Sequence, residues 1–215
     1  MNNYNVGVTA STGIASTHLG GVTIHAWSGI GIRDQLTDYD IDLLMQKEIL
    51  HRRYNNTDVL IIDEISMLHA YQLDMVNYLA QAFRQDLRPF GGMQVVLCGD
   101  LFQLPPVSKN GERQLVMESE VWQNMDIKVC YLDEQFRQKS DDKLSQILQE
   151  IRDNKISKKS EDLLAKRLQA KNTDDIEPTK LFTHNADVDR INAEELAKLD
   201  ANVRVLPMSK LGNAK

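Results

Sequence analysis

The chain has 215 residues, of which 42% are hydrophobic and 26% are charged, and this composition excludes disordered and collagen-like proteins. No run approaches the roughly 20 apolar residues of a membrane span. The first residues, Met1–Tyr4, have no basic or apolar signal region, so we expect no secretory signal. Two cysteines, Cys98 and Cys130, are too few for a disulfide framework or an all-cysteine zinc site. We therefore expect an intracellular protein, in either the nucleus or the cytoplasm, without a membrane partner.

The net charge of −6 is unevenly distributed along the chain. Residues 1–136 carry 9 Lys or Arg and 17 Asp or Glu, whereas residues 137–215 carry 16 and 14. Residues 1–32 contain no Asp, Glu, Lys or Arg. Any nucleic-acid contact by this opening stretch must therefore use hydroxyls, backbone N–H groups and rings, which often bind phosphates.

The predicted elements alternate between strands and helices. In chain order, the patterns first predict a strand over Val6–Thr9, a turn at Gly20-Gly21 and a helix over Ile41–Tyr54 capped by Asp40. A strand over Asp58–Asp63, a helix over Tyr71–Arg84, a turn over Phe90–Gly92 and strands over Gln94–Cys98 and Ile127–Leu132 follow. The last predicted elements are helices over Asp142–Asp153 and Lys158–Lys171, a strand over Leu181–Thr183 and a helix over Asp187–Leu199. Within Asp58–Asp63, the residues Val59–Ile62 form a continuous apolar run that ends in an acid, which favours a strand covered on both faces. This order predicts a parallel α/β sheet.

Two adjacent carboxylates, Asp63 and Glu64, follow the apolar residues Val59–Ile62. Ligands of open α/β sheets bind at the carboxyl ends of the strands. There, the first acid could hold Mg²⁺ and the second could deprotonate a water molecule. The alternative is a strand that ends in a solvated acidic turn.

A second feature is the loop Gly99–Val107, with the sequence GDLFQLPPV, directly after a predicted strand. Gln103 on this proline-stiffened loop could sense a phosphate, although a rigid loop with an exposed polar residue is the alternative. A third feature is Arg137 in the string QFRQ, which could reach a γ-phosphate as an arginine finger. A lone arginine near a basic segment is more often a solvated surface charge.

The fourth feature combines TASTGIA, from Thr9, with GGVTIHAW, which ends at Trp27. Hydroxyls and an imidazole beside a tryptophan suit a single-stranded backbone with stacked bases. A core tryptophan beside a satisfied histidine is an equally good interpretation.

Together, these strings resemble the Pif-one-like family of superfamily 1 DNA helicases. TASTGIAS with GGVTIHAW is similar to motif Ia, VLIIDEISML to motif II (Walker B), PFGGMQVVLCGDLFQLPPV to motif III and LDEQFRQ to motif IV. The stretches Ile147–Ser157 and Leu181–Leu199 are similar to the opening of the second RecA-like domain. Leu101 departs from the family, which usually has Phe there, and we expect little effect because both residues are apolar.

The resemblance implies roles for particular residues. Asp63 would hold Mg²⁺, Glu64 would activate the attacking water, Gln103 would read the γ-phosphate of ATP and Arg137 would stabilise the leaving charge. Candidates for contacts with single-stranded DNA are Thr9, Ser11, Thr12 and His25. The family moves 5′ to 3′ along single-stranded DNA with ATP and separates duplexes at junctions. It also acts in DNA repair, recombination and telomere maintenance.

The sequence lacks the phosphate-binding loop G-x-x-x-x-G-K-[ST], and no Gly-Lys pair occurs in it. We therefore expect a RecA-like P-loop NTPase sheet without its first strand and P-loop, plus the start of a second RecA-like domain. The expected parts are a truncated motor domain over residues 1–138, a basic helical connector over 139–177 and the truncated second domain over 178–215. An open edge should remain where the missing strand would pair.

The function predicted from these features is a fragment of an ATP-dependent 5′–3′ DNA helicase with little or no activity alone. A non-catalytic single-stranded-DNA-binding module is the alternative from a different class. An unrelated nucleotide-binding switch on the same sheet is a third hypothesis, against which the GDLFQLPP string argues.

Overall fold

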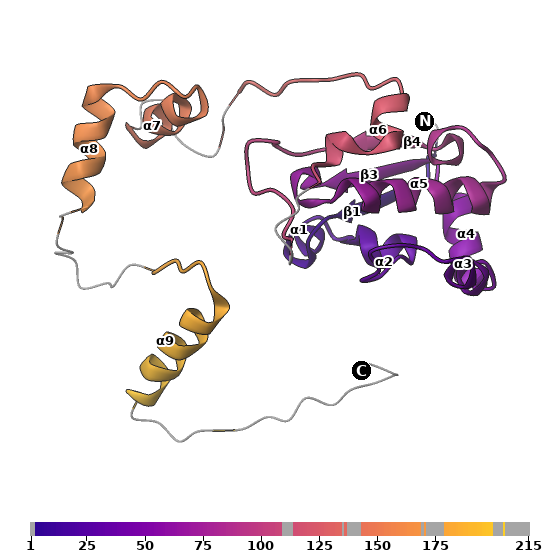
Figure 1. The fold of residues 1–215 in the computed structure, drawn as a ribbon, viewed down its shortest axis with the longest axis horizontal. Coiled ribbons are helices and arrows are strands. Elements are labelled where there is room, and N and C mark those ends of the chain that lie inside the picture. Colours follow the sequence, from indigo (N-terminus) through magenta and orange to yellow (C-terminus); the bar gives the residue numbers. More distant parts are fainter. Residues whose placement is uncertain are drawn as a thin grey trace. The chain divides into compact units, whose positions relative to one another are not determined.

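A computed structural model describes residues 3–108, 114–134, 136, 143–168, 170, 179–199 and 204 (Figure 1). The chain divides into two units, Met1–Gln146 and Ile147–Lys215, and the division falls within one helix, α7 (Lys143–Arg152). Each unit is described by itself.

The first unit is built on a parallel sheet. Its strands are β1 (Val6–Ala10), β2 (Val22–Thr23), β3 (Val59–Asp63) and β4 (Gln94–Leu97), in the spatial order β2-β1-β3-β4. Ala10 pairs with Asp63, and Ile62 pairs with Leu97, so β1, β3 and β4 end at the same edge. The predicted α/β class with a parallel sheet is confirmed.

Helices surround this sheet and share a core with it. The helices of the first unit that the structure describes are α1 (Gly13–His18), α2 (Ile24–Ser28), α3 (Asp38–Met45), α4 (Glu48–Asn56), α5 (Ala70–Arg84) and α6 (Glu120–Asn124), with 3-10 turns η1 (Ile65–Met67), η2 (Pro89–Gly92) and η3 (Val116–Glu118). The buried residues of α5 recur at helical spacing and pack in one cluster with Leu60 and Ile62 of β3. Burial of this apolar face is the main stabilising contribution of α5.

The two faces of the sheet are not equally covered, and this corrects the prediction for β3. Leu60 and Ile62 are fully buried, whereas the alternate residues Val59, Ile61 and Asp63 are only partly buried. Because successive side chains point to opposite faces of a strand, one face of the sheet packs on the core and the other is half covered. Val96 of β4, at 36% exposed, shows the same difference.

The predicted helix over Ile41–Tyr54 is two helices, α3 and α4, separated by Gln46 and Lys47. Lys47 has the extended values φ −85° and ψ 103°, so the helical hydrogen-bond ladder stops there. Thr37, not Asp40, caps α3: its hydroxyl accepts from the Asp40 N–H at 3.2 Å, and the Asp40 carboxylate accepts from the Thr37 N–H at 3.2 Å. This reciprocal pair is a capping box.

The predicted strands over Ile127–Leu132 and Leu181–Thr183 are wrong, because neither range is a strand in the structure. A strand requires a hydrogen-bonded neighbour, and residues 129–132 instead have largely exposed side chains; Leu132 is 98% exposed. β4 is the last strand of the described sheet, so no described residue pairs with its outer edge.

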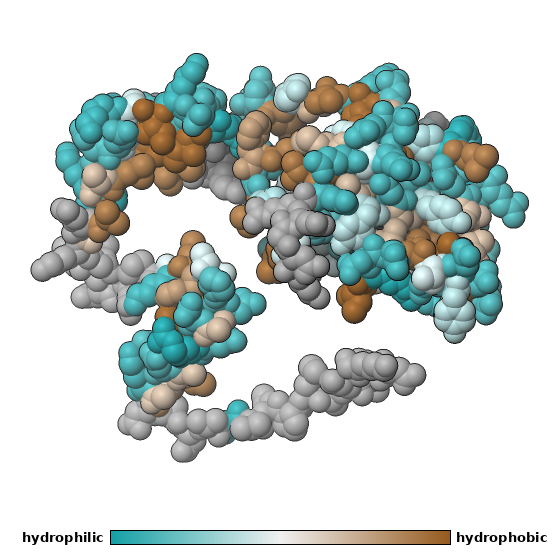
Figure 2. All heavy atoms as spheres, viewed as in Figure 1, coloured by the Kyte–Doolittle hydropathy of each residue, from teal (hydrophilic) through white to brown (hydrophobic). Residues whose placement is uncertain are grey.

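The other regular elements that the structure describes are helices. They are α7, α8 (Lys158–Leu168) and α9 (Asn185–Ala197), close to the predicted ranges. Figure 2 shows apolar side chains gathered on the surface of α7, where Leu144, Leu148 and Ile151 are each nearly half exposed. None of the helices described here is both long and apolar enough to cross a membrane.

Candidate functional site

The candidate site begins with the acid pair, Asp63 and Glu64, at the carboxyl ends of the parallel strands. Asp63 is the last residue of β3, and its backbone carbonyl accepts a hydrogen bond from the Ser11 N–H at 3.0 Å. The Ser11 hydroxyl donates to the next carbonyl, that of Glu64, at 2.8 Å. The first residue after β1 therefore holds the backbone of both acids.

Glu64 has an unusual backbone conformation, with φ 53° and ψ 44° in the left-handed region. A residue with a Cβ pays about 1–2 kcal/mol in this region, and such strain is often found at functional sites. The next residue, Ile65, donates its N–H to the Cys98 carbonyl at 3.0 Å. The turn at Glu64 is thus hydrogen-bonded to the residue after β1 on one side and to the residue after β4 on the other.

The electrostatics of the pair suit a cation. Within the ranges that the structure describes, no ion pair involves Asp63 or Glu64. Burial, and then the charge of Asp63, raise the pKa of the nearby Cys98 thiol, so the sulfur stays protonated and is a poor metal ligand. No group of three or more metal-ligating side chains occurs among the described residues. Two carboxylates match Mg²⁺, which takes one or two from protein and keeps water and phosphate oxygens.

Gln103 lies on the loop after β4, which leaves the sheet at the same edge. Its side-chain amide donates to the Asp100 carboxylate at 3.2 Å, and its N–H donates to the Asp100 carbonyl at 3.0 Å. Apolar side chains of this loop are exposed, Phe102 to 79% and Val107 to 83%. The loop is thus folded on itself around Asp100. Arg137 lies outside the described residues.

The hydroxyls predicted to contact DNA have different roles in the fold. Thr9 is fully buried, and its hydroxyl donates to the Ile61 carbonyl at 2.7 Å, so it has no surface from which to contact DNA. Thr12 caps α1 by accepting from the Ala15 N–H at 3.3 Å, and it is partly exposed. Thr9 is therefore not among the proposed DNA contacts.

His25 lies on α2 and is held from α5. Burial lowers the pKa of His25, and a hydrogen bond with the Gln72 side chain opposes this shift. The Gln72 side chain also accepts from the His69 N–H at 3.1 Å, at the start of α5. Trp27 is only 5% exposed and packs edge-on against Tyr54 at 4.9 Å, which confirms the interpretation of Trp27 as a core residue.

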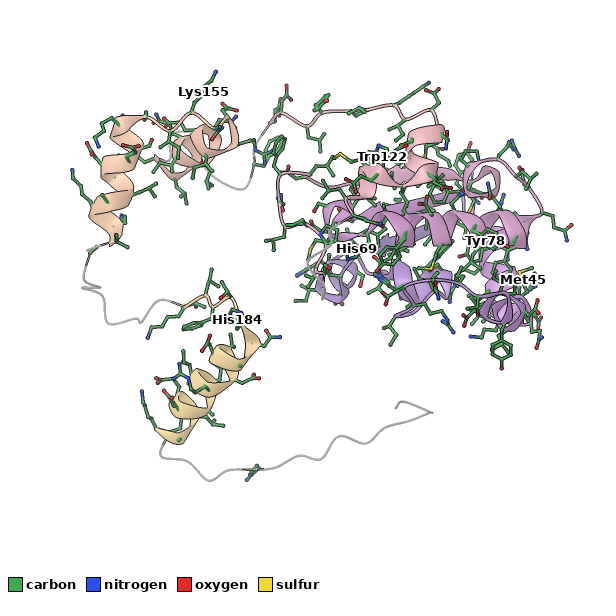
Figure 3. The ribbon with its side chains drawn as sticks, viewed as in Figure 1. Met45, His69, Tyr78, Trp122, Lys155 and His184 are labelled. Carbon is green, nitrogen blue, oxygen red and sulfur yellow. The ribbon has the colours of Figure 1, made fainter. Side chains whose placement is uncertain are left out.

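Sequence reasoning missed the junction formed by His69. Its ring nitrogen lies 3.1 Å from the Val107 carbonyl, and its ring stacks on Tyr71 at 5.0 Å. His69 itself is labelled in Figure 3. His69 therefore ties the end of the Gln103 loop to the start of α5. Its position directly after the acid-pair motif, and before an apolar helix, was the available signal.

Comparisons with known proteins give a consistent result. The sequence model of one family, described as PIF1-like helicase, matches residues 1–162. The protein named "ATP-dependent DNA helicase Pif1" from Psychrobacter sp. is 47% identical over 205 residues, which are 91% of this chain and 31% of that protein. "ATP-dependent DNA helicase PIF1" from Saccharomyces cerevisiae is 37% identical, over 94% of this chain and 24% of that protein. The chain therefore spans less than a third of the length of these two relatives.

Solved structures show the same likeness. The Pif1 helicase from Candida albicans superposes with a TM-score of 0.82 and 32% identity, over 94% of this chain and 48% of that one. The Bacteroides Pif1 helicase in complex with ADP-AlF3 and single-stranded DNA gives a TM-score of 0.72 and 31% identity, over 94% and 49%.

Proposed function

The chain belongs to the PIF1-like helicase family, and we propose that it supplies the metal-binding, water-activating and strand-contacting part of an ATP-dependent DNA helicase. The observation that carries this proposal is the acid pair, held at the common carboxyl edge of β1, β3 and β4 in a strained turn.

We assign a separate task to each acid. Asp63, at the end of β3, holds Mg²⁺, which neutralises phosphate charge when bound. Glu64 accepts a proton from the water that attacks the γ-phosphate of ATP. Gln103, on a loop at the same edge of the sheet, senses the γ-phosphate, and Arg137 stabilises the charge that develops on it.

The strand-contacting surface follows from the residues that remain accessible. Thr12, at the start of α1, and His25, on α2, are both partly exposed and precede the first charged residue of the chain, Arg33. Because burial lowers its pKa, His25 is neutral at physiological pH and contacts DNA as a hydrogen-bonding group. We propose single-stranded DNA, reached at duplex junctions and followed 5′ to 3′, as the partner.

The phosphates themselves need a further group. The sequence has no G-x-x-x-x-G-K-[ST] motif, whose backbone N–H groups and lysine would cradle them. The acid pair fits the cation and the water, and we propose that the phosphates are held by a group outside this sequence. We propose that residues 1–138 act as one motor domain, 139–177 as a connector and 178–215 as part of a second domain.

A chimaera tests this function. Residues 1–162 would replace the matching segment of the Psychrobacter protein, and ATP hydrolysis would be measured with and without single-stranded DNA. We expect DNA-stimulated hydrolysis that falls at least 100-fold in Glu64→Gln, because that amide cannot accept the proton. Glu48→Gln, on the exposed surface of α4, is the control. Equal activity of Glu64→Gln and Glu48→Gln would refute the assigned role, whereas robust hydrolysis by the 215-residue chain alone would refute the need for a further phosphate cradle.

The uncharged, hydroxyl-rich residues 1–32 favour a second candidate, a module that binds single-stranded DNA without catalysis. Titration of labelled single-stranded DNA at two salt concentrations distinguishes it, since phosphate contacts weaken with salt. Binding by the chain, together with an inactive chimaera, would support the module; no binding at low salt would eliminate it.

A further inference from the structure

The turn that carries the acid pair is gripped from the neighbouring strand by one residue, Ser11. Ser11 donates two hydrogen bonds: its N–H donates to the Asp63 carbonyl at 3.0 Å, and its hydroxyl donates to the Glu64 carbonyl at 2.8 Å. A residue that only continued the ladder would make the first bond and not the second. The second bond is made by the side chain, so it depends on the identity of the residue.

The position of this second bond matters because Glu64 is the strained residue. Its φ of 53° and ψ of 44° are unfavourable for a residue with a Cβ, so the turn keeps this conformation only if its surroundings hold it. The Glu64 carbonyl accepts twice, from the Ser11 hydroxyl and from the Met67 N–H at 3.1 Å. The bond to Met67 is local to η1, whereas the bond from Ser11 fixes the turn to β1.

The opposite side of the turn is held by β4. The Ile65 N–H donates to the Cys98 carbonyl at 3.0 Å. A Cβ on Gly99 would lie 2.9 Å from the Ile65 nitrogen and 3.0 Å from its Cγ2, so only glycine allows this approach. The turn is therefore clamped between Ser11 and the segment Cys98-Gly99.

The geometry points to Ser11 as a positioning residue whose hydroxyl, through the Glu64 carbonyl, fixes the turn after β3 and with it the Asp63 carboxylate that would hold the divalent cation. This inference rests on the proposed function, because that function makes Asp63 the residue that holds the metal ion. It differs from the role expected for Ser11 from the sequence, which was a contact with DNA. Ser11 acts through the backbone of the acids and is not itself a metal ligand.

Mn²⁺ binding to the 215-residue chain tests the inference, with free Mn²⁺ measured by electron paramagnetic resonance. In Ser11→Ala we expect the dissociation constant to rise about 10-fold, the lower end of effects of groups that orient metal ligands. Ser11→Thr keeps the hydroxyl and should return the constant to within about twofold of the original. Gly99→Ala displaces the other side of the clamp and should also weaken binding, by a route that keeps Ser11 intact.

Thr9→Val provides the matched control for stability. The Thr9 hydroxyl also donates to a carbonyl of β3, that of Ile61 at 2.7 Å, but two residues before the acid pair. This variant loses an equivalent hydrogen bond between the same strands and should keep its Mn²⁺ affinity. A purely structural role of Ser11 would instead lower the melting temperature in both variants and leave both affinities unchanged.

The outcomes separate the inference from the function on which it rests. If Mn²⁺ binding is lost in Asp63→Asn but is equal in Ser11→Ala and Thr9→Val, the positioning role is refuted and the metal site remains. If Asp63→Asn binds Mn²⁺ as well as the unaltered chain, the metal site is refuted, and the inference with it. Weaker binding in Ser11→Ala, with recovery in Ser11→Thr, supports both.

Discussion

Replacing the strained acid with glycine should stabilise the fold. Glu64 has φ 53° and ψ 44°, which cost a residue with a Cβ about 1–2 kcal/mol and cost glycine almost nothing. Glycine also has more conformational freedom in the unfolded chain, and this lowers the unfolding free energy by about 0.5–1 kcal/mol. The structure records no hydrogen bond of the Glu64 side chain among the described residues, so Glu64→Gly should gain about 0.5–1 kcal/mol of unfolding free energy.

Urea denaturation followed by circular dichroism would measure this gain in unfolding free energy. Thermal unfolding should show a rise in melting temperature of about 1–4 °C for a chain of this size. Gln85→Gly is the matched control, because Gln85 has nearly the same φ 53° and ψ 40° at the end of α5, away from the acid pair. Glu64→Gln keeps the Cβ and should leave stability within about 0.5 kcal/mol. A loss of stability in Glu64→Gly, with a gain in Gln85→Gly, would refute the assignment of strain to Glu64.

Two further predictions concern stability. The Asp74 carboxylate of α5 accepts hydrogen bonds from two backbone N–H groups at the start of α6, at 2.9 and 3.1 Å. Asp74→Ala should therefore lower the unfolding free energy by about 1–2 kcal/mol in the same urea assay, whereas the exposed Asp42→Ala should leave it unchanged. Equal effects of the two variants would refute this capping role. Burial lowers the pKa of His25 below 6.5, so the unfolded state binds more protons, and the unfolding free energy should fall as the pH drops below about 6.5. His25→Gln should remove this component of the pH dependence, and an identical pH profile in the variant would contradict it.

The sequence predicts the elements whose signal is local. The helix α5 was predicted almost to the residue because its apolar positions recur over four turns. The acid pair was placed correctly at the end of β3 because an apolar run ends there. In contrast, α3 and α4 were merged, since the break at Lys47 has no glycine or proline to mark it.

Features that depend on neighbours could not be predicted in this way. Ile127–Leu132 is as apolar as β4, yet it is no strand, because strand formation depends on a partner and not on composition alone. Likewise, Thr9 and Ser11 are both hydroxyl residues in one motif, and only the register of β1 against β3 shows that both hydroxyls bind the backbone of the sheet. The left-handed turn at Glu64 has no signal in a single sequence, because glutamate is not a residue typical of that region.

The most direct test of the metal site at Asp63 is to locate a bound cation on the chain. Mn²⁺ added to the ¹⁵N-labelled protein broadens the amide signals of residues close to the ion. If Asp63 holds the ion, the signals of Ser11, Asp63, Ile65 and Gly99 should broaden first, and Asp63→Asn should prevent this. Broadening that starts instead at exposed acids such as Asp38 of α3, or that persists unchanged in Asp63→Asn, would contradict it.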